Sequence, residues 1–213
     1  MKDSLKVNKM QQFSRNDAVV HEKNIKYNGF FKLEEYHVSH LLFMGGTSQI
    51  FTREVFERGD AVVVIPYDPV LDSVVLVEQF RAGALRTQNS PWLLEFIAGM
   101  FSEDESPVDV AIREAKEEAN LSIEEKDIEH VMNYLSSPGG MSEEIHLFVA
   151  KVDSVESGGV FGLDEEQEDI LVHVVPREKA LELLKQGNIC NAATVIGLQW
   201  LQLNYKQLQQ QWC

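Results

Sequence analysis

Residues 99–121 read G-M-F-S-E-D-E-S-P-V-D-V-A-I-R-E-A-K-E-E-A-N-L, and this stretch decides the fold and points to the chemistry. Glu117 and Glu118 follow Glu114 by three and four residues, so on a helix the three side chains project from one face. Like charges crowded in this way repel by roughly 0.2–0.5 kcal/mol per pair on an isolated helix. A divalent cation held by carboxylate oxygens is the simplest compensation. The stretch therefore predicts a helix whose acidic face binds a metal ion.

The same stretch contains the signals that begin and end a helix. Ser106 is a good N-cap, Pro107 suits the first helical position, and Asp109 stands three residues after the cap. An apolar stripe at helical spacing follows, made of Val108, Ala111, Ile112, Ala115 and Ala119. Asn120 comes where helices often end in a left-handed residue, for which Asn is second only to Gly. We therefore expect the helix to end at about Asn120.

Composition places the chain among proteins with a sizeable core. Its 213 residues are 44% hydrophobic and 25% charged, which suits one large domain or a domain with a smaller appendage. Cys190 and Cys213 are too few for a disulfide framework or a cysteine metal site. No apolar run approaches the ~20 residues of a membrane span, and residues 1–12 are polar and lack the apolar segment of a signal peptide. We expect a cytoplasmic protein.

The net charge of −15 is unevenly distributed and limits the possible partners. Residues 1–60 carry nine basic and eight acidic groups, whereas residues 61–213 carry ten basic and twenty-six acidic groups. A field of that sign repels nucleic acid and anionic membrane surfaces, so neither is an expected partner. A small phosphorylated ligand stays possible if metal ions neutralise the site. Taken alone, the acidic excess favours a simple role in solubility.

The remaining pattern predicts a layered domain of strands and helices. Six apolar or β-branched runs read as strands, namely Ala61–Pro66, Val74–Phe80, Trp92–Ala98, Ile128–Tyr134, Glu144–Val152 and Ile170–Val175. Residues 30–39 alternate loosely and are expected to form a hairpin with the chain from Gly45 onward. Further helices are expected from Pro176 to about Lys185 and from about Asn191 to the C-terminus. The apolar stripe of the last helix packs on its own domain or on a partner subunit. The order of elements indicates an α+β or α/β domain.

The acidic helix resembles the signature of a known family. That signature is G, five residues, E, seven residues, then R-E-U-x-E-E-x-G-U, in which U is apolar. The chain matches it with Gly99, Glu105, Arg113, Glu114, Ala115, Glu117, Glu118 and Leu121. Asn120 stands where the family has Gly, and since Asn tolerates the left-handed conformation we expect intact chemistry. The chain thus resembles the Nudix hydrolases, which cleave a nucleoside diphosphate linked to another group.

The resemblance implies roles for the residues of the signature. Glu114, Glu118 and the backbone carbonyl of Ala98 would bind the metal ion, which the family implies to be Mg²⁺ with Mn²⁺ able to substitute. Glu117 would assist them. Arg113 would orient the glutamates through charge-assisted hydrogen bonds, and Glu105 would lock the loop. The metal would neutralise phosphate oxygens and acidify a bound water.

The similarity extends over residues 27–203 and favours one branch of the family. Stretches such as Y-N-G-F-F, V-E-Q-F-R, S-S-P-G-G-M-S-E and E-D-I-L-V-H-V-V resemble the bacterial ADP-ribose pyrophosphatase branch. This implies hydrolysis of ADP-ribose to AMP and ribose 5-phosphate. It also implies an α+β Nudix fold, an α/β/α sandwich with a mixed sheet, in residues 58–213. Residues 1–57 would be a β-rich segment that is exchanged in a homodimer and completes the substrate pocket.

The long acidic loop at residues 154–169 is the next candidate. By resemblance, its segment L-D-E-E-Q-E-D-I supplies the catalytic base at Glu166 and a further metal ligand at Glu168, with the adjacent Glu165 as a rival for the base. A mobile loop suits this role because closure brings the base over the metal ions only when substrate is bound. From composition alone, a disordered acidic loop is an equally good interpretation.

Four residues outside these segments are candidate substrate contacts. Arg53 and Arg81 are rare positive charges that could bind phosphate or ribose, although an isolated arginine is more often a surface salt-bridge partner. Phe30 could stack on adenine, although an aromatic residue at a strand start is more often core. Glu143 follows the P-G-G sequence at residues 138–140 and is expected to hydrogen-bond the terminal ribose.

Three alternatives to an ADP-ribose hydrolase stay open. The first is a Nudix hydrolase of another nucleoside diphosphate sugar. The second is a non-catalytic ADP-ribose sensor on the same fold, which the presence of all four signature glutamates argues against. The third is a structural acidic protein, which leaves the register of residues 99–121 unexplained.

Overall fold

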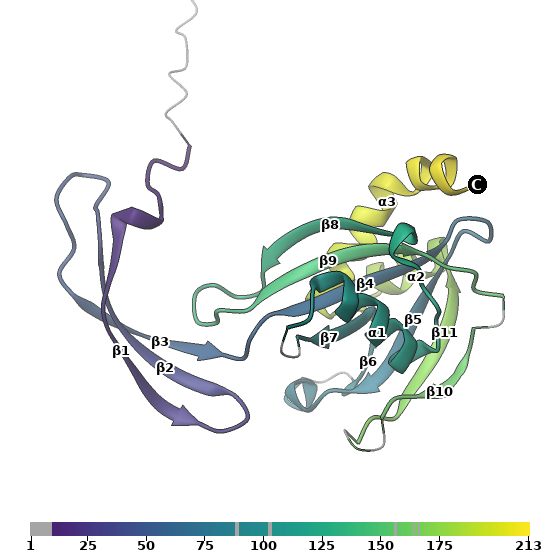
Figure 1. Cartoon of the computed structure of the whole chain (residues 1–213), viewed down its shortest axis with the longest axis horizontal. Coiled ribbons are helices and arrows are strands. Elements are labelled where there is room, and N and C mark those ends of the chain that lie inside the picture. The colour runs from purple at the N-terminus through teal and green to yellow at the C-terminus, as the bar shows by residue number, and fades with distance from the viewer. Residues whose placement is uncertain (1–9, 88–89, 102–103, 156, 164, 166) are drawn as a thin grey trace, which may run out of the picture. The chain divides into compact units, whose positions relative to one another are not determined.

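Two β-sheets organise the chain in the computed structural model, which describes residues 10–87, 90–101, 104–155, 157–163, 165 and 167–213 (Figure 1). The sheets belong to two compact units. The first unit runs to Arg58 and includes Ser137–Ser142. The second comprises Gly59–Ser136 and Glu143–Cys213 and contains the three α-helices of the described residues.

The first unit contains a three-stranded antiparallel sheet that follows a short 3₁₀ helix, η1 (Arg15–Asp17). Its strands are β1 (Ala18–Asn28), β2 (Lys32–His40) and β3 (Phe51–Glu57), with β2 in the centre. The predicted strand at residues 30–39 is confirmed as β2, and its hairpin partner begins at Phe51. β1 was not predicted because nearly all of its residues are exposed, so no buried face sets an apolar alternation.

The second unit is built on a mixed eight-stranded sheet. Six strands form its path in the order β10 (Gly159–Phe161), β11 (Ile170–Pro176), β5 (Ser73–Phe80), β4 (Ala61–Asp68), β9 (Glu144–Lys151) and β8 (Ile128–Leu135). β4 and β9 pair in parallel, whereas the other pairs are antiparallel. The loop predicted at residues 154–169 contains the short strand β10, which the sequence did not reveal. A 3₁₀ helix, η3 (Glu125–Asp127), precedes β8.

Strands β4 and β5 separate after a short paired region, and two further strands fill the gap. Among the described residues, β4 and β5 pair only where residues 67–68 of β4 lie opposite residues 73–74 of β5. β6 (Trp92–Glu95) then pairs with β5, and β7 (Ile97–Met100) pairs with β4. The prediction of one strand over Trp92–Ala98 is therefore wrong, because the chain changes partner at Phe96. There the Phe96 N–H donates to the Thr194 hydroxyl at 2.9 Å, a bond to a helix and not to a neighbouring strand.

Helices cover both faces of this sheet (Figure 1). α1 (Pro107–Ala119) packs on one face against Val62, Val64 and their neighbours. α2 (Arg177–Lys185) and α3 (Ala192–Trp212) pack on the other face against Val63 and its neighbours. Every residue of β4 is buried, as expected for a strand covered on both sides. The predicted α+β class with a mixed sheet is confirmed.

The apolar stripe of the C-terminal helix packs on its own unit. Leu198, Leu201 and Leu208 are buried in the core beside β4 and β9, so the first of the two predicted alternatives holds for them. Gly197 lies so close to Phe96 that a Cβ atom on it would come within 2.8 Å of the ring. The glycine therefore allows α3 to pack closely against the residue at which the chain changes its partner strand. Among the described helices, none combines the length and the apolar character that crossing a membrane requires.

Candidate metal and catalytic site

The local sequence of α1 produces the helix as predicted. The Ser106 hydroxyl accepts a hydrogen bond from the Asp109 N–H, and the Asp109 carboxylate accepts in return from the Ser106 N–H, which completes a capping box. Asn120 ends the helix in the left-handed conformation, with φ 52° and ψ 25°. The Leu121 N–H then donates back to the carbonyl of Ala115, which satisfies a terminal carbonyl. The departure from the family glycine therefore preserves the helix end.

Arg113 is the centre of an ion-pair network on the acidic face. Its guanidinium donates to both carboxylate oxygens of Glu105, at 2.8 and 3.0 Å. It also donates to Glu114 at 2.6 Å, to Glu117 at 3.0 Å and to the carbonyl of Met100 at 3.2 Å. The Glu105 hydrogen bonds and the charges of the other glutamates raise the pKa of Arg113. The network ties α1 to the loop before it and to the end of β7.

Gly99 leaves the space that Glu114 occupies. A Cβ atom added at Gly99 would lie 1.8 Å from Oε1 of Glu114, so any larger residue would displace that carboxylate. Glu114 is largely buried, and burial raises its pKa while the adjacent Arg113 opposes the shift. The glycine of the signature is therefore explained by close packing of β7 against the first carboxylate.

Glu118 is a buried carboxylate for which the structure shows no ion pair among the described residues. Its exposed fraction is 2%, and among the described residues the structure gives it one hydrogen bond, from the Ala98 N–H at 3.2 Å. Burial, followed by the negative charge of Glu114, raises the pKa of Glu118 to about 8. Burying a carboxylate in this way is unfavourable unless a cation or a proton compensates it. Its chemistry fits a hard divalent cation such as Mg²⁺, which prefers carboxylate oxygens.

The acidic loop brings a third carboxylate toward this pair. The negative charge of Glu168 contributes to the raised pKa of both Glu114 and Glu118, so its side chain lies within electrostatic range of them. The Leu163 N–H donates to Glu168 at 3.2 Å and holds its side chain. In the described part of the chain, no three His, Cys, Asp or Glu side chains are grouped so that they could hold a metal ion. Glu165 is exposed, and Glu166 lies outside the described residues.

Arg81 lies near the same carboxylates but is paired with a residue that the sequence did not single out. Its Nε and Nη2 atoms contact Oε2 of Glu95 at 2.9 and 2.8 Å. Glu95 is buried, with an exposed fraction of 3%, whereas the Arg81 side chain is 42% exposed. The charge of Arg81 also lowers the pKa of Glu118, in opposition to burial. A lone acid in the apolar run W-L-L-E-F-I was the signal that could have revealed Glu95.

The other three predicted substrate contacts lie in different places. Phe30 is 87% exposed in the turn between β1 and β2, so it is not a core residue. Arg53 stands on β3, donates to the carbonyl of Thr52 and lies over the ring of Phe51. Both belong to the first unit. Glu143 belongs to the second unit, where it is buried and accepts a hydrogen bond from the Ser136 hydroxyl at 2.6 Å.

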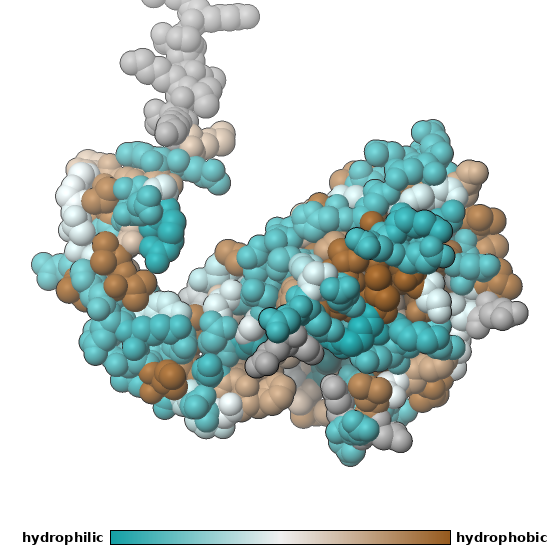
Figure 2. All heavy atoms as spheres, in the orientation of Figure 1, coloured by the Kyte–Doolittle hydropathy of each residue, from teal (hydrophilic) through white to brown (hydrophobic). Residues whose placement is uncertain are grey.

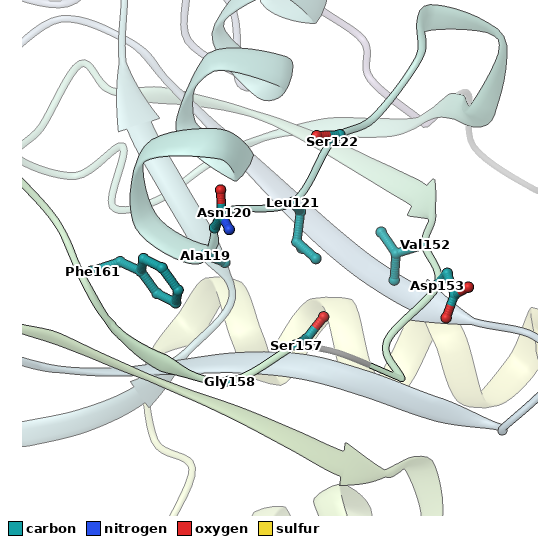
Figure 3. Close-up of a pocket in the computed structure, with 9 residues that line it drawn as sticks. All are labelled: Ala119, Asn120, Leu121, Ser122, Val152, Asp153, Ser157, Gly158 and Phe161. Carbon is teal, nitrogen blue, oxygen red and sulfur yellow. The ribbon is translucent and has the colours of Figure 1, made fainter.

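A separate cavity lies beyond the C-terminal end of α1. It has a volume of about 320 Å³ and is lined by the helix end at Asn120, the segment after β9 and Phe161 of β10 (Figure 3). Val152 and Asp153 come from the segment after β9. None of the α1 glutamates lines this cavity, so it is distinct from the carboxylate site.

The comparisons with known proteins concern the family and the fold. The model of the NUDIX domain matches residues 57–195. A solved structure described as an ADP compounds hydrolase superposes with a TM-score of 0.67 over 92% of this chain and 98% of its own, at 20% sequence identity. At that identity the likeness concerns the fold alone.

Sequence relatives carry the comparison further. The chain is 49% identical over 209 residues to the ADP-ribose pyrophosphatase of Haemophilus influenzae, which covers 97% of this chain and 95% of that protein. It is 48% identical over 200 residues to the ADP-ribose pyrophosphatase of Escherichia coli K12, with 94% and 95% covered. A GDP-mannose pyrophosphatase of Cronobacter sakazakii is 40% identical over 71% of this chain. Nudix hydrolases generally need a divalent metal ion. With a domain match over residues 57–195 and relatives at 48–49% identity, the chain belongs to the Nudix hydrolase family.

Proposed function

We propose that this protein hydrolyses ADP-ribose to AMP and ribose 5-phosphate with Mg²⁺ as its metal ion. The observation that carries the proposal is the likeness to ADP-ribose pyrophosphatases at 48–49% identity over nearly the whole chain. The GDP-mannose pyrophosphatase shares a shorter region at lower identity. The buried pair Glu114 and Glu118 supports catalysis over a sensor function, because a sensor has no need to keep carboxylates in an unfavourable environment.

The metal-binding residues that we propose are Glu114, Glu118, Glu168 and the carbonyl of Ala98. All four belong to the second unit, and the Ala98 N–H already bonds Glu118, so strand and helix meet at this point. When bound, Mg²⁺ neutralises phosphate oxygens and acidifies a water molecule. Arg113 and Glu105 orient the carboxylates, and Glu117 supports them through its bond to Arg113.

The proposed base is Glu166, with Glu165 as the alternative. A base on the loop that also carries Glu168 reaches the attacking water when the loop closes over the substrate. We expect Glu166→Gln to reduce kcat by about 10²–10⁴-fold while Mg²⁺ and ADP-ribose binding stay intact. A larger loss of kcat in Glu165→Gln than in Glu166→Gln would move the base by one residue. Stopped-flow measurement of single turnovers separates the chemical step from binding.

The substrate contacts that we propose are Arg81 and Glu143 in the second unit, and Phe30 and Arg53 in the first. Arg81 has a half-exposed guanidinium near the carboxylates, which suits a diphosphate oxygen. Glu143 can accept a hydrogen bond from a ribose hydroxyl. Phe30 presents an exposed ring of the kind that stacks on a base, and Arg53 adds a positive charge on β3.

A homodimer is the assembly that we propose, with residues 1–57 as the dimerisation and substrate segment and residues 58–213 as the hydrolase domain. The first unit exposes many large apolar side chains, some of which are visible among hydrophilic ones in Figure 2. The exposed set includes Ile25, Tyr27, Phe30, Phe43, Met44 and Ile50. Exposed apolar side chains in such number favour burial in a partner. Sedimentation equilibrium at micromolar concentration should give twice the chain mass of 24.2 kDa.

The two cysteines support a cytoplasmic location. Cys190 and Cys213 are free and exposed, as is usual in a reducing compartment.

A substrate panel with Mg²⁺ tests the proposed function directly. We expect kcat/KM to be highest for ADP-ribose in a comparison with NADH, ADP-sugars and GDP-mannose. A higher kcat/KM for GDP-mannose would favour the second candidate, for which the 40% identical relative gives the reason. Turnover of no member of the panel, in a folded protein that still binds ADP-ribose, would favour the sensor.

A further inference from the structure

The half-exposed Arg81 side chain is bound from its buried side by Glu95, and Glu95 is bound by the N-cap residue of α3. We propose that Glu95 is a positioning residue for substrate binding, which holds the Arg81 guanidinium beside the α1 carboxylates and is itself fixed by Asn191 of α3. This inference rests on the proposed function, since it assigns Arg81 to a phosphate oxygen of the substrate. It adds two residues to the site whose side chains act through Arg81.

The ion pair between Arg81 and Glu95 sets the orientation of the arginine. Two of the three guanidinium nitrogens, Nε and Nη2, contact the same carboxylate oxygen at 2.9 and 2.8 Å. The third nitrogen, Nη1, is not bonded to Glu95 and belongs to a side chain that is 42% exposed. A planar guanidinium held along one edge presents its other edge in a fixed direction. Arg81 is thus prepared to donate to an anion without losing further side-chain freedom.

Glu95 is held on its other oxygen by the helix on the opposite side of the strand change. The Asn191 side chain donates from Nδ2 to Oε1 of Glu95 at 2.9 Å. Asn191 is also the N-cap of α3, because its Oδ1 accepts from the Thr194 N–H at 3.0 Å. The Thr194 hydroxyl in turn accepts from the Phe96 N–H. The first turn of α3 therefore fixes both the side chain of Glu95 and the backbone that follows it.

Residues 95–98 contact both Arg81 and the carboxylate of Glu118. Glu95 holds Arg81, and three residues later the Ala98 N–H bonds the buried carboxylate of Glu118. Under the proposed function, Arg81 would bind a phosphate oxygen and Glu118 would hold the metal ion, so both roles depend on this segment. Movement of residues 95–98 would change the position of Arg81 relative to the metal ligands.

A double-mutant cycle in kcat/KM for ADP-ribose tests the proposal, with Mg²⁺ and the full chain. Arg81→Ala should lower kcat/KM by about a hundredfold through KM, as expected for a lost bond between a charged group and phosphate. Glu95→Gln should lower it by about tenfold, because the negative charge is lost and the single side-chain oxygen of Gln can accept from Arg81 or from Asn191 but not from both. The double variant should be no worse than Arg81→Ala. Asn191→Ser keeps a side-chain oxygen for the cap and loses the bond to Glu95, so we expect a smaller rise in KM.

Glu78→Gln is the matched control. Glu78 stands on β5 and pairs with His173 at 2.8 Å, so this variant removes a carboxylate from the same sheet without touching Arg81. Its KM should stay at the wild-type value. Thermal melts of all variants exclude loss of the fold as the cause of a changed KM.

The outcomes separate this inference from the proposed function. If Arg81→Ala lowers kcat/KM and Glu95→Gln does not, Glu95 is structural only and the inference is wrong. Additive losses in the double variant would also overturn it, since Glu95 would then act independently of Arg81. If ADP-ribose is not hydrolysed by the wild-type protein, the proposed function itself fails.

Discussion

Two carboxylates in the second unit are buried to nearly the same depth and are treated differently by their surroundings. Glu95 has an exposed fraction of 3% and contacts Arg81, Asn191 and, at 3.5 Å, Gln79. Glu118 has an exposed fraction of 2%, and its described partner is one backbone N–H. The fold satisfies the first carboxylate with its own cation and leaves the second with a pKa raised to about 8. This difference is the reason why Glu118, and not Glu95, is the proposed metal ligand.

The largest expected effect comes from neutralising the unsatisfied carboxylate. Glu118→Gln should lower kcat by at least about 10³-fold, because a metal ligand is lost. Without metal at pH 8, the folded state should be at least as stable as that of the wild type, since the neutral side chain removes an unfavourable buried charge. Glu114→Gln should behave alike in kcat. The kcat of each variant is measured with ADP-ribose and Mg²⁺. A wild-type kcat in either variant would contradict the metal assignment. It would also remove the proposed functional difference between Glu118 and Glu95.

A smaller effect is expected when the carboxylate of Glu114 is displaced and Glu95 is left unchanged. Gly99→Ala adds a methyl group where Oε1 of Glu114 lies at 1.8 Å, so the carboxylate must move. We expect kcat to fall by about 10–100-fold, as for misplacement of a catalytic group by about an ångström. Gly83→Ala is the control, because its methyl group enters open space. Equal kcat in Gly99→Ala and the wild type would show that Glu114 can move without consequence.

Metal and pH provide a third way to separate the two carboxylates. The pKa of Glu118 is raised on folding from 4.5 to about 8, so its contribution to stability is full below pH 4.5 and is lost as the pH rises to about 8. In EDTA, the Tm of the wild type should therefore fall over this range by at least about 3 °C more than the Tm of Glu118→Gln. Excess Mg²⁺ should reduce this difference. Identical slopes in scanning calorimetry would mean that Glu118 titrates normally.

The smallest effect is expected at the residue that ends the helix carrying Glu118. Asn120→Gly relieves the left-handed conformation at φ 52° and loses an exposed contact with Lys116. These effects oppose each other, so the free energy of unfolding should change by less than about 1 kcal/mol. Urea denaturation measures this change, and kcat should stay the same. A large loss of kcat would show that Asn120 does more than cap the helix.

The parts of the fold that depend on local sequence were predicted well. Ser106, Pro107 and Asn120 marked both ends of α1, because caps and left-handed residues act within a few positions of the chain. The strands β4 and β5 were also recognised, since burial on both faces produces continuous apolar runs. The break at Phe96 was missed because its cause, the hydroxyl of Thr194, lies 98 residues away in the sequence.

The candidate site was predicted unevenly for the same reason. The signature between Gly99 and Leu121 predicted the acidic face, because its members share one helix and the strand before it. Glu95 was missed, because its importance comes from Arg81 and Asn191, which are brought to it by folding. The assignments of Glu166 and of the substrate contacts stay predictions, and Glu166 lies outside the described residues.

The change of partner strand at Phe96 has a consequence for insertions and deletions. Side chains keep alternating through the change, so Glu95, Ile97 and Gly99 face α1 while Phe96 and Ala98 face α2 and α3. One residue more or less between Glu95 and Gly99 would turn the Arg81 support and the Glu114 niche to opposite sides of the sheet. The support of Arg81 and the space for Glu114 therefore both depend on the number of residues in this segment. Homologous enzymes could vary the apolar residues of this segment, but its length should be invariant.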